Sequence, residues 1–177
     1  MFKKGDYVVY KKNVCIIKDI IDNYYILCSL EDKTLTIKVP VNSEIRNVIS
    51  KKECQRIIRL IPNIETIKIA DRNLELEYKR LLSTGNLEDL IKIIKTTYLR
   101  NKNRLSSHKK IGEKDDTYFK KAEKLLYDEM SISLNLTFNE TKKYVESEVK
   151  KYEKIGKFNN ELQNNKNINK KVTLCNN

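Results

Sequence analysis

The segment KTLTIKVPVNSEIRNVISKKECQRIIRLI, residues 33–61, decides the fold because it passes from strand periodicity to helix periodicity within one short stretch. Around Ile37 and Val39 apolar and polar residues alternate, which predicts a strand with one buried face and one exposed face that carries Lys38. Ser50 then opens an S-x-x-E capping pattern, and apolar residues follow at helical spacing. The segment therefore marks the junction between a β part and an α part.

The residues before this junction predict a small antiparallel β structure. Residues 7–48 are rich in Val, Ile, Tyr and Thr, and short polar turns interrupt them. We expect these strands to close into a small barrel that forms a domain over residues 1–50.

The residues after the junction predict an all-α domain over 51–154. Gly85 suits the end of one helix, and Asn86 suits the cap of the next. The spacing of Tyr98 and Tyr118 among aliphatic residues predicts that both rings pack in a core. Apolar residues at helical spacing predict helices over 51–61, 71–83, 87–103 and 115–130, and a fifth from a Thr137 cap to near Tyr152.

The C-terminal residues 155–177 form a separate class of sequence. Asn and Lys dominate them, and no apolar period is sustained, so we expect a disordered tail. The fold class predicted for the whole chain is α+β, with two segregated domains and about five helices.

The net charge of the 177-residue chain is +12, which favours a polyanionic partner or simply keeps the protein in solution. The charge gathers between Lys92 and Lys124, where 11 Lys or Arg residues stand against four acids. Lysine-rich surfaces are common, so composition alone leaves DNA binding and a merely solvated face equally open. The candidate DNA-binding residues are Arg72, Lys92, Lys95, Arg100, Lys102, Arg104, Lys109, Lys110 and Lys114.

Motifs for catalysis or cofactor binding are missing from the sequence. It has no Gly-rich phosphate loop and no metalloprotease motif, and its single histidine, His108, lies in a polar basic stretch. None of the four cysteines forms a C-x-x-C pair, so we expect no metal site. We therefore expect a protein that is not an enzyme and binds no cofactor. No run of about 18 apolar residues occurs, so we also expect no membrane association and a cytoplasmic location.

Four stretches of the sequence resemble the CarD-type regulators of bacterial RNA polymerase, and the resemblance spans residues 2 to about 153. They are FKKGDYVVY at residues 2–10, TIKVPVNSEIRNVISKKE at 36–53, LLSTGNLEDLIKIIKTTYLR at 81–100 and YFKKAEKLLYDE at 118–129. The last two are similar to a clostridial branch of that family.

The resemblance implies an N-terminal Tudor-like barrel that docks on the β subunit of RNA polymerase and a helical domain that contacts promoter DNA. It places Lys38, just before Val39-Pro40, in the polymerase-binding strand. Thr36 and Lys33 join it as candidates, because they share its exposed face or the adjoining turn. One departure from the family is clear. Many members carry a tryptophan that wedges into the DNA, at a position that corresponds to the region near Asp71, and this chain has no Trp.

We therefore expect a transcription regulator, monomeric in solution, that tethers to RNA polymerase and touches the promoter backbone to alter the lifetime of the open complex. Two alternatives remain open from the sequence. One is a nucleic-acid-binding module for RNA or the ribosome that works without polymerase. The other is a pure interaction protein whose basic face serves only solvation.

Overall fold

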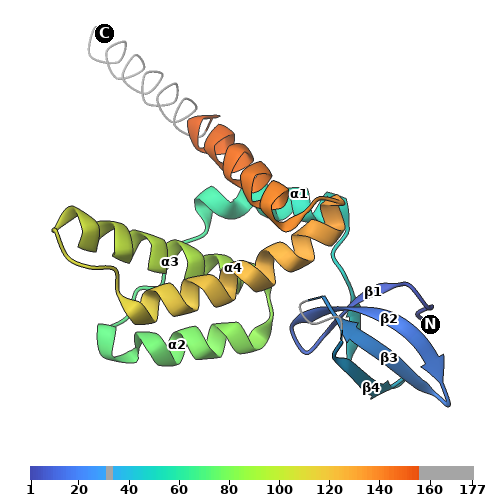
Figure 1. The fold of residues 1–177 in the computed structure, drawn as a ribbon. Helices are drawn as coiled ribbons and strands as arrows, with labels where there is room; N and C mark the ends of the chain where they lie inside the picture. Colours follow the sequence, from blue (N-terminus) through green and yellow to red (C-terminus); the bar gives the residue numbers. More distant parts are fainter. Residues whose placement is uncertain (31–33, 156–177) are drawn as a thin grey trace, which may run out of the picture.

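The structure is a computed structural model that describes residues 1–30 and 34–155. An N-terminal β-sheet is followed by five α-helices in this part of the chain, so the predicted α+β class is confirmed (Figure 1). Most of the buried apolar residues form two clusters, one within the sheet and one among the helices. Each part of the molecule thus has a hydrophobic core of its own.

The sheet is antiparallel and its strand order is β4-β3-β2-β1-β5. Among the described residues β4 and β5 are its two edges and do not pair with each other, so the sheet is open and closure into a barrel is not confirmed. The strands are β1 (Tyr7–Tyr10), β2 (Asn13–Ile21), β3 (Tyr24–Ser29), β4 (Thr36–Pro40) and β5 (Ile45–Asn47).

Tight turns and a small apolar core hold the sheet together. Asp22 and Asn23 both have positive φ, at 49° and 63°, which is the geometry that a two-residue hairpin loop requires. Cys15 lies in the core with 2% of its surface exposed, and burial raises the pKa of its thiol. The buried members of the core are Val8, Cys15, Ile17, Tyr25, Leu27 and Val39.

The α-helices of the described residues occur along the chain in the order that the sequence predicts, and one 3₁₀ turn follows the first of them. Two of them, α3 and α4, run beyond their predicted ranges of 87–103 and 115–130. At the end of α4, the polar residues Ser131 and Ser133 interrupt the apolar pattern from which the helix was predicted. Their hydroxyls donate to backbone carbonyls of the preceding turn, and the helix continues past them. The elements are α1 (Lys51–Leu60), η1 (Ile61–Asn63), α2 (Asp71–Thr84), α3 (Leu87–Ser106) and α4 (Glu113–Leu134), followed by a helix over residues 138–155.

The helix boundaries confirm the capping residues expected from the sequence. The hydroxyl of Ser50 accepts a hydrogen bond from the backbone N–H of Glu53 at 3.2 Å. The side chain of Asn86 accepts from the backbone N–H of Glu88 at 2.9 Å, directly after Gly85 has ended α2 with φ of 63°. These local signals fix where the chain turns back on itself.

The last described helix begins after Thr137, as expected, and it continues past Tyr152 through residue 155, the last residue that the structure describes. Lys and Glu at this end are good helix formers. Of the predicted tail over 155–177, all residues from 156 onward lie outside the described part of the chain.

The helical core is built where α2, α3 and α4 run side by side (Figure 1). Tyr118 is buried in it as predicted, with 7% of its surface exposed, whereas the prediction for Tyr98 is wrong because that ring is 56% exposed. Cys54 is fully buried, and this burial, with a smaller contribution from the charge of Glu129, raises the pKa of its thiol to about 12. No helix in the described residues is long and apolar enough to cross a membrane.

Candidate functional site

Strand β4 is an exposed edge of the sheet. It pairs with β3, where Lys38 lies opposite Ile26 and Thr36 lies opposite Cys28, and its other side carries no strand among the described residues. Val39 points into the core with 1% of its surface exposed, while Thr36 and Lys38 face solvent. An edge of this kind offers unpaired backbone N–H and C=O groups to a partner.

Lys38 is positioned by an aromatic ring. Its ammonium lies 4.5 Å from the centre of the Tyr24 ring on the neighbouring strand, a cation–π arrangement that restrains the side chain at the sheet edge. The exposure of Lys38 agrees with the alternation seen in the sequence. Lys33, the third residue predicted here, lies outside the described residues.

The cations predicted on α3 divide into two groups, and those in the body of the helix have structural contacts. Lys92 pairs with Asp89 on the same helix at 3.0 Å. The ammonium of Lys95 donates to the carbonyls of Ile61, Pro62 and Ile64 at 2.8, 3.1 and 2.5 Å. Its burial lowers its pKa. Lys95 therefore caps the end of α1 and η1 and is directed away from any external anion.

Arg100 is also bound to acids of the protein itself. Its guanidinium donates to Asp115 at 3.0 Å and to Asp71 at 2.9 Å, and Asp115 in turn accepts from the hydroxyl of Tyr78 at 3.0 Å. Burial, and then the charge of Asp115, raises the pKa of Tyr78. The hydrogen bonds with Asp71 raise the pKa of Arg100. The network ties α2, α3 and α4 together at one end of the helical layer.

The candidate residues predicted from the sequence do not include Asp115, which the structure buries, with 6% of its surface exposed. Its partners come from two other helices, so the pairing appears only in the three-dimensional packing. One signal was present in the sequence: Asp115 lies three residues before Tyr118, at the spacing that places both on one face of a helix.

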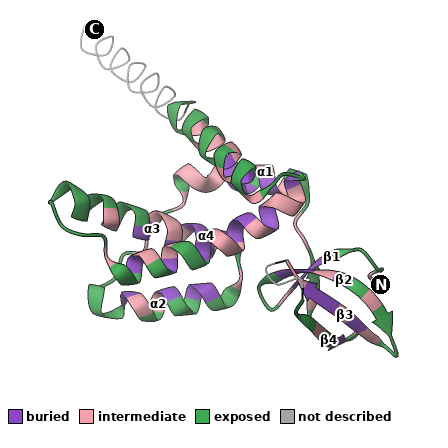
Figure 2. Cartoon of the chain, viewed as in Figure 1, coloured by how far each residue is buried: buried purple, intermediate pink, exposed green. Residues whose placement is uncertain are grey.

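The remaining predicted cations of α3 gather where the helix ends. We call Lys102, Arg104, Lys109 and Lys110 the α3 tip; all four are exposed, as the green ribbon at the end of α3 indicates (Figure 2). No Asp or Glu occurs between Asp89 and Glu113 in the sequence. The α3 tip is therefore a basic surface, and its own segment of the chain contains no acid that could neutralise it.

Hydrogen bonds give the α3 tip a defined shape. The guanidinium Nε of Arg104 donates to the carbonyl of Lys110 at 3.0 Å, and the backbone N–H of Lys109 donates to the carbonyl of Arg104 at 2.8 Å. Beyond the turn, the N–H of Gly112 donates to the side chain of Asn101 at 3.0 Å. The basic loop is thus folded back on the helix from which it emerges.

Apolar side chains are exposed in the same region. Tyr98, Leu105 and Ile111 are 56%, 55% and 49% exposed. The α3 tip and its neighbouring residues thus combine positive charge with an aromatic ring and aliphatic groups. Nucleic-acid backbones contact positive charge, and bases contact aromatic rings.

Two further predicted cations, Arg72 and Lys114, lie beside one member of the α3 tip. Together with Arg104 and the acids Asp71, Glu75, Glu113 and Asp115, they line a cleft of about 360 Å³ between the start of α2 and the start of α4. Lys114 pairs with Glu75 at 2.6 Å. Positive and negative groups alternate there, so this cleft is not a basic surface.

The described residues contain no cluster of three His, Cys, Asp or Glu side chains arranged to hold a metal ion.

Replacing Lys95 with Met should lower the free energy of unfolding by about 1–3 kcal/mol, because three helix-terminal carbonyls lose their donor while the aliphatic stem keeps its packing. Urea denaturation followed by circular dichroism measures this. Lys92→Met on the same helix is the matched control, and its loss should stay within about 0–1 kcal/mol because it removes a half-exposed ion pair between neighbouring turns of one helix. Equal losses in the two variants would contradict the capping role.

Glu75 should titrate far below an ordinary glutamate. Hydrogen bonds from Lys114 and then Lys79 lower its pKa to about 2. Because the folded pKa is depressed, the stabilisation from these contacts is present above the unfolded value of about 4.3 and is lost as the pH falls toward about 2. Carboxyl-carbon NMR measures the midpoint, which should rise in Lys114→Gln and stay in place in Lys109→Gln. A midpoint near the ordinary value in the wild-type protein would refute the contact.

Comparison with known proteins assigns no family to this chain, because no protein-family model matches it and no curated protein matches it. A functional assignment therefore has to rest on the residues and on their geometry.

Proposed function

We propose that this protein is a cytoplasmic, non-enzymatic regulator of bacterial transcription of the CarD type. Its N-terminal part acts as a Tudor-like domain that docks on the β subunit of RNA polymerase, and its α3 tip contacts the backbone of promoter DNA. One observation carries the proposal: the chain presents an open edge strand on one domain and, on the other, a basic segment that contains no acid between Asp89 and Glu113, and the two lie at opposite ends of the molecule (Figure 1).

The docking of polymerase on β4 is supported by the character of the edge. A protein partner can add a strand to such an edge, since main-chain hydrogen bonds supply affinity and alternate side chains supply specificity. Thr36 and Lys38 are the side chains that face outward next to this edge. Lys38 also directly precedes the Val39-Pro40 pair, which lies in one of the four stretches that resemble the CarD family.

DNA contact by the α3 tip is supported by the exposed charge that remains once the structural cations are set aside. Each lysine or arginine of the tip can neutralise a phosphate, and this releases bound counterions and makes the affinity depend on salt. Lysine carries no geometry that distinguishes one base from another. The contact is therefore proposed to be with the backbone and tolerant of sequence.

Regulation requires only a small energy difference between two polymerase states. A protein that binds the open promoter complex about 1.4 kcal/mol more tightly than the closed one shifts that equilibrium tenfold. Tethering through the sheet raises the local concentration of the α3 tip at the DNA, so individually weak phosphate contacts are sufficient.

A second candidate is a polymerase-independent module for single-stranded RNA. It is favoured by the exposed ring of Tyr98, because unpaired bases stack on aromatic rings. This candidate requires that the free protein bind RNA without polymerase, which separates it from the first.

Lys38→Glu should abolish association with purified bacterial RNA polymerase while leaving the fold intact, because the reversed charge stands on the proposed docking edge. Co-purification on immobilised polymerase measures the association, and circular dichroism checks the fold. Lys3→Glu makes the same change of charge at another exposed site of the N-terminal domain and should bind as the wild type does. Undiminished binding by folded Lys38→Glu would discredit β4 as the docking edge.

The double variant Lys109→Glu/Lys110→Glu should weaken duplex DNA binding and reduce the slope of log affinity against log salt by about 0.9 for each phosphate that is no longer neutralised. Fluorescence anisotropy over a range of salt concentrations measures both quantities. Lys51→Glu/Lys52→Glu changes the same charge at the exposed start of α1 and serves as the control. Similar slopes in the two double variants would assign the effect to net charge and would remove the α3 tip from the proposal.

A further inference from the structure

The two domains meet at an ion pair between β5 and the middle of α4. The guanidinium of Arg46 binds the carboxylate of Glu129 through two hydrogen bonds of 2.5 and 2.9 Å. Glu129 is buried, with 2% of its surface exposed, whereas the side chain of Arg46 is 46% exposed. A bidentate pair of this kind constrains direction as well as distance.

The segment that joins the domains is attached to the same turn of α4. The backbone N–H of Ile49 donates to Glu129 at 3.1 Å, and the carbonyl of Ile49 accepts from the hydroxyl of Ser133 at 2.8 Å. Both main-chain polar groups of one connecting residue are thereby bound to α4. The connection between β5 and α1 is only residues 48–50, so little of it is left to bend.

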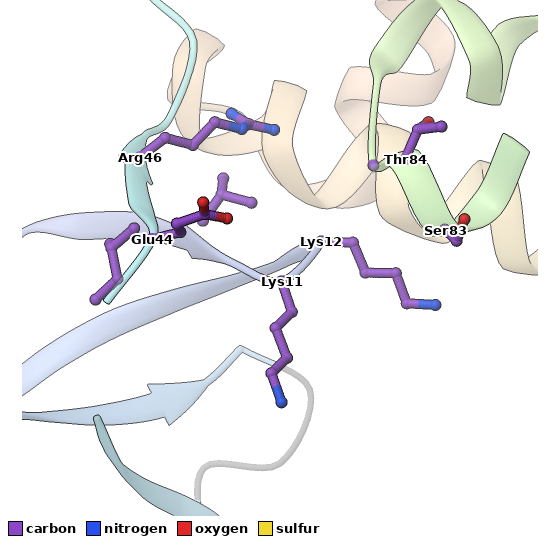
Figure 3. Close-up of a pocket in the computed structure, with 9 residues that line it drawn as sticks. Lys11, Lys12, Glu44, Arg46, Ser83 and Thr84 are labelled. Atoms are coloured by element: carbon purple, nitrogen blue, oxygen red, sulfur yellow. The ribbon is translucent and has the colours of Figure 1, made fainter. Parts of the chain in front are cut away.

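A second contact lies across a cleft from this pair. The turn between α2 and α3 abuts the turn between β1 and β2, so closely that a Cβ placed on Gly85 would lie 3.1 Å from the Cβ of Lys12. Between the two contacts is a cleft of about 520 Å³, seen in Figure 3 with Arg46 on one side and Thr84 on the other. The domains thus touch at separated places with open space between them.

The two buried clusters do not merge where the domains meet. In the described part of the chain, the buried cluster of the sheet comes from residues 8–39 and that of the helices from residues 54–145. Glu129 is a buried charge at this contact. A buried carboxylate that loses its partner has to find another or draw in water, which makes the pair decisive for the arrangement.

We propose that the Arg46–Glu129 pair is a positioning device that sets the angle between the β-sheet and the helical layer, and with it the direction of β4 relative to the α3 tip. Its use rests on the proposed function: one rigid molecule then holds polymerase and DNA in a fixed relation. Two sites in fixed relation bind a matching two-part target with an effective concentration that freely swinging domains lack.

The angle is tested directly by the distance between two nitroxide labels, measured by pulsed electron resonance. The labels are placed at Asn42→Cys and Asn103→Cys in a Cys175→Ser chain, where the other three cysteines are buried and unlabelled. Arg46→Ala should broaden or shift the distance distribution in a protein whose two domains remain folded. Arg56→Ala removes an arginine whose ion pairs lie on the helices, and it should leave the distribution unchanged.

A second variant excludes simple misfolding. Arg46→Leu/Glu129→Leu removes the unpaired buried charge, so it should fold as stably as the wild type and still show the broadened distribution. An unchanged distribution in either folded variant would overturn the proposal.

The consequence for function has a separate measurement. Affinity for polymerase alone and for DNA alone should be unchanged in Arg46→Ala, while affinity for the polymerase–promoter complex should fall about tenfold. A broadened distribution with undiminished affinity for that complex would overturn the positioning role. If the wild type binds neither partner, the proposed function fails, and the distance measurement still decides whether the pair sets the angle.

Discussion

A carboxylate removed from water has to be neutralised where it lies, and α4 carries two of them. Asp115 near its beginning is bound by Arg100 of α3 and by Tyr78 of α2, and Glu129 in its second half is bound by Arg46 of β5. The first pairing holds the helical layer together, and the second attaches the sheet to that layer. The sheet, α2 and α3 are therefore all attached to α4. The two exposed surfaces, the β4 edge and the α3 tip, take their positions from this helix.

The sequence predicts well those structural features that depend on residues close to one another in the chain. The alternation around Lys38 and the caps at Ser50 and Asn86 appear in the structure as expected, because each depends on residues within one turn or one strand. It does not predict Glu129, whose arginine partner is 83 residues away. One signal was present: Glu129 lies three residues after Leu126, at the spacing that places a residue on the buried face of the helix.

The cations of α3 show why counting charge overstates a binding surface. In the sequence Lys95, Arg100 and Lys102 look alike, yet the first caps a helix end, the second neutralises the buried Asp115 and the third is exposed to solvent. The difference is set by what α3 packs against at each level, which a one-dimensional pattern does not contain. Tyr98 is the converse case, since its helical spacing suggests a core but it lies on the exposed face of α3, next to the fully buried Thr97. What distinguishes the α3 tip is thus its place in the packing.

The buried thiols give each domain an internal reporter. Cys15 belongs to the core of the sheet and Cys54 to that of the helices, and burial raises the pKa of both. Since alkylating reagents attack the thiolate, neither sulfur reacts while its own core is closed. Pulsed alkylation at a single one of these cysteines therefore follows the opening of one core at a time. The rates at which the two halves of the molecule open can be compared with one another in the intact chain, without cutting it in two.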